Sequence, residues 1–288
     1  MKRLIVNADD LGADDARNAG IIEAIEAGSV TAASILVNGP AFQDCLQRIT
    51  LADFNHISFG VHLNLTEGMP LSAGLKSITG ADGCFCGKQE AHRRLMSRGN
   101  DALEEEIRQE FAAQIQALRA AGMRIDHLDG HQHVHIFPAA IDAAIRAGRE
   151  FGIPWMRIPE EPLPSGSMER NSPLLNDEAQ MFCRLAAAAR IRIHGSTLST
   201  TDHFRGLYLK GRLSLARLER TLQTLPPGLT ELMVHPGRAH GGPPVQGPFS
   251  AFSNRERKTE LEVLTSGSFH RMLEKYHVRL TPFPEACP

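Results

Sequence analysis

Four short segments of the chain concentrate aspartate and histidine residues just after an apolar run. They are 7–12 (NADDLG), 60–65 (GVHLNL), 126–135 (DHLDGHQHVH) and 233–237 (MVHPG). Carboxylates and imidazoles bind divalent metals, and they also transfer protons during hydrolysis. In parallel α/β folds, ligands bind outside the carboxyl ends of the strands, so we expect the four segments to meet at one rim.

Asp9 and Asp10 are adjacent carboxylates that follow an apolar strand. Because successive side chains of a strand diverge, one carboxylate can bind a metal while the other acts as a general base. Gly12 then lets the backbone turn away sharply. The alternative is an ordinary polar turn that leads into a helix, since Asp and Gly are common in loops. This segment alone leaves both interpretations open.

His62 lies in the most regularly alternating strand of the chain. Phe59, Val61 and Leu63 share one face of this strand, whereas His62 and Asn64 share the other. In a barrel the apolar face meets the helices, which turns His62 and Asn64 inward. An inward histidine is either a metal ligand or a structural residue that bonds a backbone carbonyl.

The segment 126–135 is the richest in histidine. Its four imidazoles belong to His127, His131, His133 and His135. If the segment is extended, His131, His133 and His135 share one face, as metal ligands would. The alternative is a histidine-rich surface loop.

Two further residues stand at predicted strand ends. His235 suits a general acid, with a packing role as the alternative. Arg157 could hold a substrate oxygen or form a surface ion pair, and the sequence does not separate these.

Other kinds of nucleophile lack support. The chain has no GxSxG elbow, no P-loop and no Rossmann glycine fingerprint. Its five cysteines lie outside the four segments, in a spacing that forms neither a disulfide framework nor a CxxC zinc site. A metal-activated water remains as the nucleophile.

Short apolar runs alternate with amphipathic segments along the chain. Strands are expected at 4–6, 31–37, 57–65, 124–128, 155–158, 191–194 and 232–234. Helices are expected at 15–27, 41–49, 101–121, 138–149, 215–225, 254–264 and 269–276. This alternation predicts a single α/β domain over 1–288, a distorted, TIM-like (β/α) barrel of about seven strands. The segments 160–176 and 237–247, rich in Pro, Gly or Ser, are expected to be loops over the site.

Composition restricts the partners. The 288 residues carry a net charge of −2 and only 6% aromatic residues, which favours neither nucleic acid nor an anionic membrane. The sequence predicts no signal peptide and no membrane span, so we expect a cytoplasmic protein that acts on a small molecule or an oligosaccharide. A homo-oligomer stays open.

The four segments resemble the motifs of the YdjC-like (ChbG-type) carbohydrate deacetylase family. The segment 7–12 looks like its NADDxG motif, and 129–135 is similar to its D-S/G-H-x-H-V-H segment. The segments 60–65 and 235–237 are similar to its GxHLxL and H-P-G elements, and 257–266 is similar to its closing R-x-x-E-L…L-T-S signature. Leu11 replaces the phenylalanine that is common in the family.

The resemblance implies a distorted barrel that removes an acetyl group from an N-acetylated sugar with one divalent metal, Mg²⁺ or Zn²⁺. It implies Asp10, His62 and His131 as metal ligands, Asp9 as the base and His235 as the acid, although the two aspartates could exchange roles. Arg157 and Asn64 are candidate substrate contacts, and Asn64 and Asp129 could instead orient the histidines. The alternatives are a metal-dependent phosphoesterase and a non-catalytic sugar-binding protein on the same scaffold.

Overall fold

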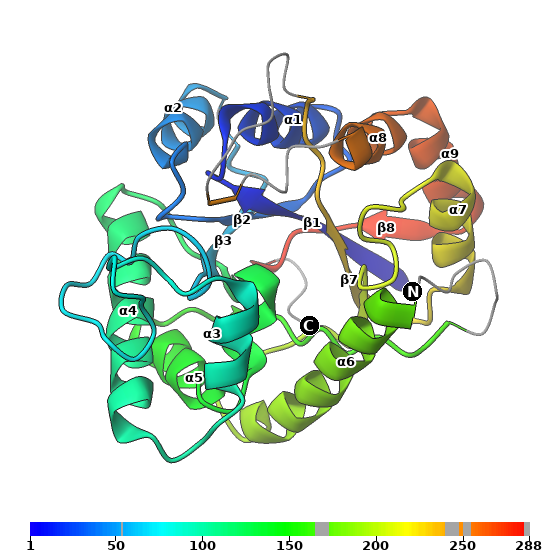
Figure 1. Ribbon diagram of the computed structural model, residues 1–288. Coiled ribbons are helices and arrows are strands. Elements are labelled where there is room, and N and C mark those ends of the chain that lie inside the picture. Colours follow the sequence, from blue (N-terminus) through cyan, green and yellow to red (C-terminus); the bar gives the residue numbers. More distant parts are fainter. Residues whose placement is uncertain (53, 165–172, 240–247, 250–254, 285–288) are drawn as a thin grey trace.

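The centre of the molecule is a curled parallel sheet (Figure 1). The computed structural model describes all residues except 53, 165–172, 240–247, 250–254 and 285–288. The strands follow the order β5-β4-β3-β2-β1-β7-β6, and β8 also pairs with β1. They are β1 (Lys2–Leu11), β2 (Ala32–Ile35), β3 (Ser58–Leu63), β4 (His127–Gly130), β5 (Trp155–Met156), β6 (His203–Arg205), β7 (Gly228–Val234) and β8 (Val278–Leu280). This arrangement confirms the predicted α/β fold with a distorted, TIM-like barrel.

Most of the helices surround the outer side of the sheet (Figure 1), whereas the 3₁₀ helix that directly follows β4 lies at the carboxyl end of the sheet. They are α1 (Asp15–Glu26), α2 (Phe42–Ala52), α3 (Lys88–Leu95), α4 (Asp101–Ala120), the 3₁₀ helix η1 (His131–Ile136), α5 (Ile141–Glu150), α6 (Pro173–Ile193), α7 (Leu215–Thr224), α8 (Arg255–Leu264) and α9 (Gly267–Lys275). None of the described helices is both long and apolar enough to cross a membrane.

The alternation of side chains along β1 separates the apolar core from the polar site. Leu4 and Val6 join the main core cluster between the sheet and the helices. Ile5 belongs to a smaller apolar cluster inside the curl, which Phe283 completes. Asp9 follows on the same face as Ile5, because strand side chains repeat every two residues. The interior is therefore apolar near the start of β1 and polar near its end.

The predicted strand at 191–194 is wrong. These residues form the end of α6 and the turn after it. Ile191 is 76% exposed and Ile193 is 5% exposed, although residues two apart on a strand would share a face. On a helix they point to nearly opposite sides, which explains the difference. The same helix begins within the predicted loop 160–176, whose residues 165–172 lie outside the described part of the chain.

Candidate metal centre and catalytic cavity

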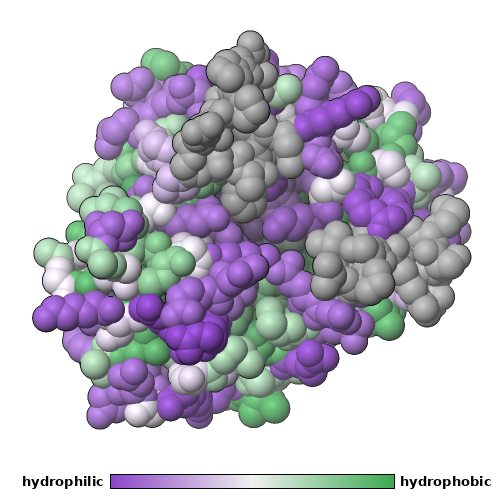
Figure 2. Space-filling model, viewed as in Figure 1, coloured by the Kyte–Doolittle hydropathy of each residue, from purple (hydrophilic) through white to green (hydrophobic). Residues whose placement is uncertain are grey.

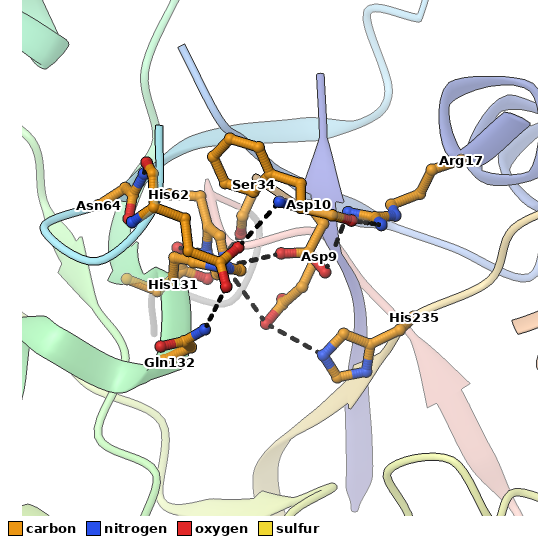
Figure 3. Close-up of polar contacts among 12 residues, drawn as sticks. Asp9, Asp10, Arg17, Ser34, His62, Asn64, His131, Gln132 and His235 are labelled. Carbon is orange, nitrogen blue, oxygen red and sulfur yellow. Dashed lines mark hydrogen bonds and ion pairs between the residues drawn. The ribbon is translucent and has the colours of Figure 1, made fainter. Parts of the chain in front are cut away.

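Both aspartates of β1 reach one polar space at the carboxyl end of the sheet (Figure 3). The register between β1 and β2 shifts between Ala8 and Leu11, and Asp10 has a φ of 72°, in the left-handed region. An irregularity of this kind re-aims side chains at a strand end. Asp9 and Asp10 are both buried, and their carboxylates have different partners.

Asp10, His62 and His131 form the first candidate set of metal ligands. Each offers one ligand atom, and these atoms all lie within 4.8 Å of one another. Asp10 Oδ1 is 2.9 Å from His131 Nδ1 and 3.4 Å from His62 Nε2. One carboxylate and two imidazoles suit several divalent metals. The structure thus brings together three residues that lie far apart in the sequence, on β1, β3 and the start of η1.

A second candidate set consists of Asp9, His62 and Asp129. Asp129 Oδ1 already lies 2.8 Å from His62 Nδ1, so it holds the ring from the side opposite to Asp10. A carboxylate behind a histidine is the usual support of a metal-binding imidazole. Asp9 accepts two hydrogen bonds from Arg157, at 2.8 and 2.7 Å. The geometry therefore favours the first set, with Asp129 as a support of His62.

Arg157 is the centre of a fully buried ion-pair cluster. Besides Asp9, its guanidinium contacts Asp129 at 2.9 Å and Glu231 at 2.7 Å. Burial opposes its charge, but these three carboxylates raise the pKa of Arg157 well above its usual value. Because a planar guanidinium binds carboxylates in a fixed geometry, the cluster holds Asp9 in one orientation.

The space next to Asp10 and His62 favours a positive charge. Burial lowers the pKa of His62, but the charges of Asp129 and Asp9 outweigh it and raise that pKa to about 10. Burial also opposes ionisation of Asp10, yet Arg17 and the hydrogen bonds with His131 and His62 hold its pKa well below the usual range. An ionised carboxylate beside two imidazoles is a donor set that fits a divalent cation.

A cavity of about 480 Å³ opens beside these residues. Asp9, Asp10, His62, His131 and His235 all line it. Figure 3 shows the His235 ring approaching Asp9 from β7, and its Nε2 lies 3.9 Å from Asp9 Oδ2. The Nδ1 atom of His235 is enclosed and has no hydrogen-bond partner among the described residues. Hydrophilic residues gather over the middle of this face of the molecule (Figure 2).

Residues 3–275 match the family described as YdjC-like protein. The chain belongs to the YdjC-like family. It is 35% identical to a carbohydrate deacetylase of Mus musculus over 300 residues, which cover 96% of this chain and 93% of that protein. It is 29% identical to a carbohydrate deacetylase of Brevibacillus brevis, with 98% and 99% covered.

The fold of this YdjC-like chain also matches a solved structure. A putative cellobiose-phosphate cleavage protein of Enterococcus faecalis V583 superposes with a TM-score of 0.74 at 22% identity, covering 100% of this chain and 99% of that one. At this identity the match concerns the fold alone.

Two predicted substrate contacts lie away from the cavity wall. Arg157 is 0% exposed and donates to both oxygens of Asp9, which excludes a surface ion pair, and it is not among the residues that line the cavity. Asn64 is also buried. Its side chain bonds Asn38 and the backbone of the 64–67 turn, so it shapes this turn, and it bonds no histidine within the part of the chain that the structure describes.

His131, His133 and His135 would share one face only in an extended segment, and this condition is not met. The segment coils into η1 instead of extending, with φ values of 51° at Gln132 and 58° at His133. The three rings therefore separate: His131 faces Asp10, His133 lines the cavity, and His135 Nε2 bonds the carbonyl of Arg157 at 2.9 Å.

Sequence reasoning missed several buried polar residues that support the site. Asn7 donates to Asp9 Oδ1 at 2.8 Å, and Ser34 donates to Asp129 Oδ2 at 2.6 Å. Glu231 of β7 binds Arg157. Each lies within a strand that is almost completely buried. In the sequence, the available signal was a polar residue within or next to an apolar run. Lys88, Glu178 and Phe182 also line the cavity, but they lie on α3 and α6, which the sequence did not predict.

Replacing Arg157 with methionine is expected to destabilise the protein by about 3–5 kcal/mol, because three buried carboxylates lose their common partner. The free energy of unfolding, measured by urea titration, tests this. The matched control is Arg192→Met, which breaks a half-exposed ion pair with Asp142 and should cost less than about 1 kcal/mol. Equal losses in the two variants would contradict the role of the cluster.

We expect Glu161 to make the free energy of unfolding depend on pH. It is buried, and its Oε2 accepts hydrogen bonds from the backbone N–H groups of Gly206 and Leu207. Burial raises the pKa of Glu161 from 4.5 to about 7. Between these values the folded state holds a proton that the unfolded state releases, so stability falls as the pH rises through this window. Relative to Glu161→Gln, the wild type should lose roughly 3 kcal/mol of unfolding free energy from pH 4.5 to pH 7. A difference that is constant with pH would contradict the assignment.

Proposed function

We propose that this YdjC-like protein is a metal-dependent hydrolase that removes the acetyl group from an N-acetylated sugar. The observation that carries the proposal is the ligand set Asp10, His62 and His131 at the wall of a cavity that also contains Asp9 and His235. The names of the relatives, carbohydrate deacetylases, support the substrate class. A cavity of about 480 Å³ is also of the size that binds small ligands.

Asp10, His62 and His131 would hold one divalent cation, Mg²⁺ or Zn²⁺. When bound, such a cation polarises a carbonyl oxygen and lowers the pKa of a water molecule. Asp129 fixes the His62 ring, and this keeps Nε2 directed toward Asp10. One carboxylate and two imidazoles suit both metals, so the availability of each metal decides which one binds.

Asp9 and His235 would move the protons. Asp9 Oδ2 faces both His62 and His235, at 3.9 Å from each ring, so it can accept the proton of the attacking water. The water oxygen forms a bond to the acetyl carbon, and the bond from that carbon to nitrogen breaks. His235 donates a proton to the leaving nitrogen, which gives acetate and an amino sugar. Arg157 holds both Asp9 oxygens throughout.

A metal-dependent phosphoesterase is the second candidate. The four sequence segments contain no lysine or arginine, but the cavity is also lined by Lys88, Lys210 and Arg212. Cationic side chains of this kind favour a phosphate group. Lys88 is already paired with Glu178, which weakens this candidate.

Acetate release tests the proposal directly. The protein would be incubated with N-acetylglucosamine and its oligosaccharides, with chelator or with added Mg²⁺ or Zn²⁺, and with 4-nitrophenyl phosphate in parallel. We expect acetate release that the chelator abolishes and a metal restores. Phosphate release without acetate would favour the phosphoesterase, and sugar binding without either product would favour the binding protein.

A further inference from the structure

Two residues within one turn of α8 form hydrogen bonds with the backbone of His235. His235 follows Val234, the last residue of β7 that pairs with β1, so among the described residues the β1–β7 pairing does not extend to its peptide groups. Buried backbone groups need partners elsewhere. Arg257 and Glu260 of α8, both buried, supply them.

Each polar backbone atom of His235 has its own contact with α8. Glu260 Oε2 accepts a hydrogen bond from the His235 N–H at 2.6 Å, and Arg257 Nη1 donates to the His235 carbonyl at 3.4 Å. Arg257 Nη2 also lies 3.7 Å from Asp10 Oδ2. Gly237 N–H in turn donates to the Arg257 carbonyl at 3.2 Å. The backbone around His235 is therefore tied to α8 at three points.

The second oxygen of Glu260 binds a different part of the cavity wall. Its Oε1 accepts a hydrogen bond from the Gly211 N–H at 3.1 Å. Gly211 lines the cavity together with Lys210 and Arg212. One carboxylate thus connects the peptide of His235 to the segment opposite.

We propose that Glu260 is a positioning residue, which sets the place of the His235 ring beside Asp9 and couples it to the cavity segment at Gly211. The inference rests on the proposed function, in which His235 protonates the leaving nitrogen. Loss of this support should therefore slow the cleavage of bonds whose leaving group must be protonated. The cleavage of bonds whose leaving group needs no proton should keep its rate.

Glu161 offers a matched control for Glu260. Burial raises the pKa of each carboxyl to about 7, and each accepts hydrogen bonds from two backbone N–H groups. Both donors to Glu161, and one of the two donors to Glu260, belong to the connection between β6 and α7. Glu161 uses a single oxygen for both bonds, and a glutamine oxygen can replace it there. Glu260 uses one oxygen for each, so in Glu260→Gln an amide NH₂ must face one of the two N–H donors.

The test compares wild type, Glu260→Gln, Glu161→Gln and His235→Gln at pH 8, where both glutamates are ionised. Two substrates are used: an N-acetylated sugar, whose amine must be protonated on leaving, and 4-nitrophenyl acetate, whose phenolate leaves without a proton. We expect Glu260→Gln to lower kcat for the sugar roughly 100-fold, since a small misplacement of a reacting group has effects of this size. Its KM, its metal content and its rate with 4-nitrophenyl acetate should change less than about 3-fold. His235→Gln should show the same selectivity, and Glu161→Gln should behave as wild type.

Equal losses on both substrates, or the same loss in Glu161→Gln, would overturn the proposal and leave Glu260 a structural role. A wild type that releases acetate from neither substrate would instead refute the proposed function.

A second measurement does not depend on activity: the NMR signals of the His235 ring should shift in Glu260→Gln and stay unchanged in Glu161→Gln. If Glu260→Gln does not fold, Glu260→Asp keeps both acceptor oxygens with a shorter reach and takes its place. Unchanged His235 signals in a folded Glu260 variant would refute the positioning role.

Discussion

Replacing His131 with alanine is expected to remove both the bound metal and the activity. His131 supplies one of only two imidazoles of the favoured ligand set, and its Nδ1 lies 2.9 Å from Asp10. A metal contributes several kcal/mol to stabilising the transition state of such a hydrolysis. A loss of about 4 kcal/mol corresponds to a rate roughly 1000-fold lower. Metal content by elemental analysis and acetate release measure the two effects.

The control for this variant is His194→Ala, because His194 is an exposed histidine after α6. It should keep both the metal and the activity, and circular dichroism should show both variants folded. Retention of the metal in His131→Ala would favour the set Asp9, His62 and Asp129, which lacks His131. In that case Asp129→Asn would lose the metal instead.

The positions of the site residues could be predicted from the sequence because they follow simple strand geometry. His62 stands in a strand with a period of two, so its inward direction follows from the apolar residues on the other face. Asp9, Asp10 and His235 come at the ends of parallel strands, and these ends meet at one rim. The structure indeed places these residues, with His131, around one cavity.

The conformation of 131–136 could not be predicted in the same way. Gln132 and His133 adopt left-handed φ values, which cost roughly 1–2 kcal/mol per residue in isolation and depend on tertiary contacts. Phe182 supplies one such contact, since the centroid of its ring lies 4.7 Å from the centroid of the His133 ring. Phe182 belongs to α6, more than forty residues later, and no local pattern connects the two.

Arg157 shows a different limit. In the sequence it is one arginine near a strand end, and its partners Asp9, Asp129 and Glu231 lie on three other strands. Whether an arginine contacts a substrate or a carboxylate depends on which side chains share its space. The sequence does not give this arrangement, because it depends on the order of the strands in the sheet. Among the described strands β5 pairs with β4, whereas Asp9 and Glu231 lie on β1 and β7, several strands away.

Replacing Asp9 with asparagine is expected to abolish turnover and to leave the metal in place. The amide keeps the size of the carboxylate but cannot accept a proton from water, and loss of a general base costs typically 100- to 10,000-fold in rate. Asp9 is not in the favoured ligand set, so the metal content should stay near wild type. Arg157 keeps Asp129 and Glu231 as partners, and the fold should therefore survive the change.

The companion variant Asp10→Asn separates the roles of the two neighbouring aspartates. It should lose affinity for the metal, because Asp10 Oδ1 is the oxygen that faces both His62 and His131. Asp15→Asn, an exposed aspartate at the start of α1, serves as the control and should change neither property. Titration calorimetry with the metal and the rate of acetate release give the two readouts for each variant. If Asp9→Asn lost the metal and Asp10→Asn kept it, the base and the ligand would exchange places. The Arg157 cluster would then hold a ligand rather than the base, because it fixes Asp9 in either case.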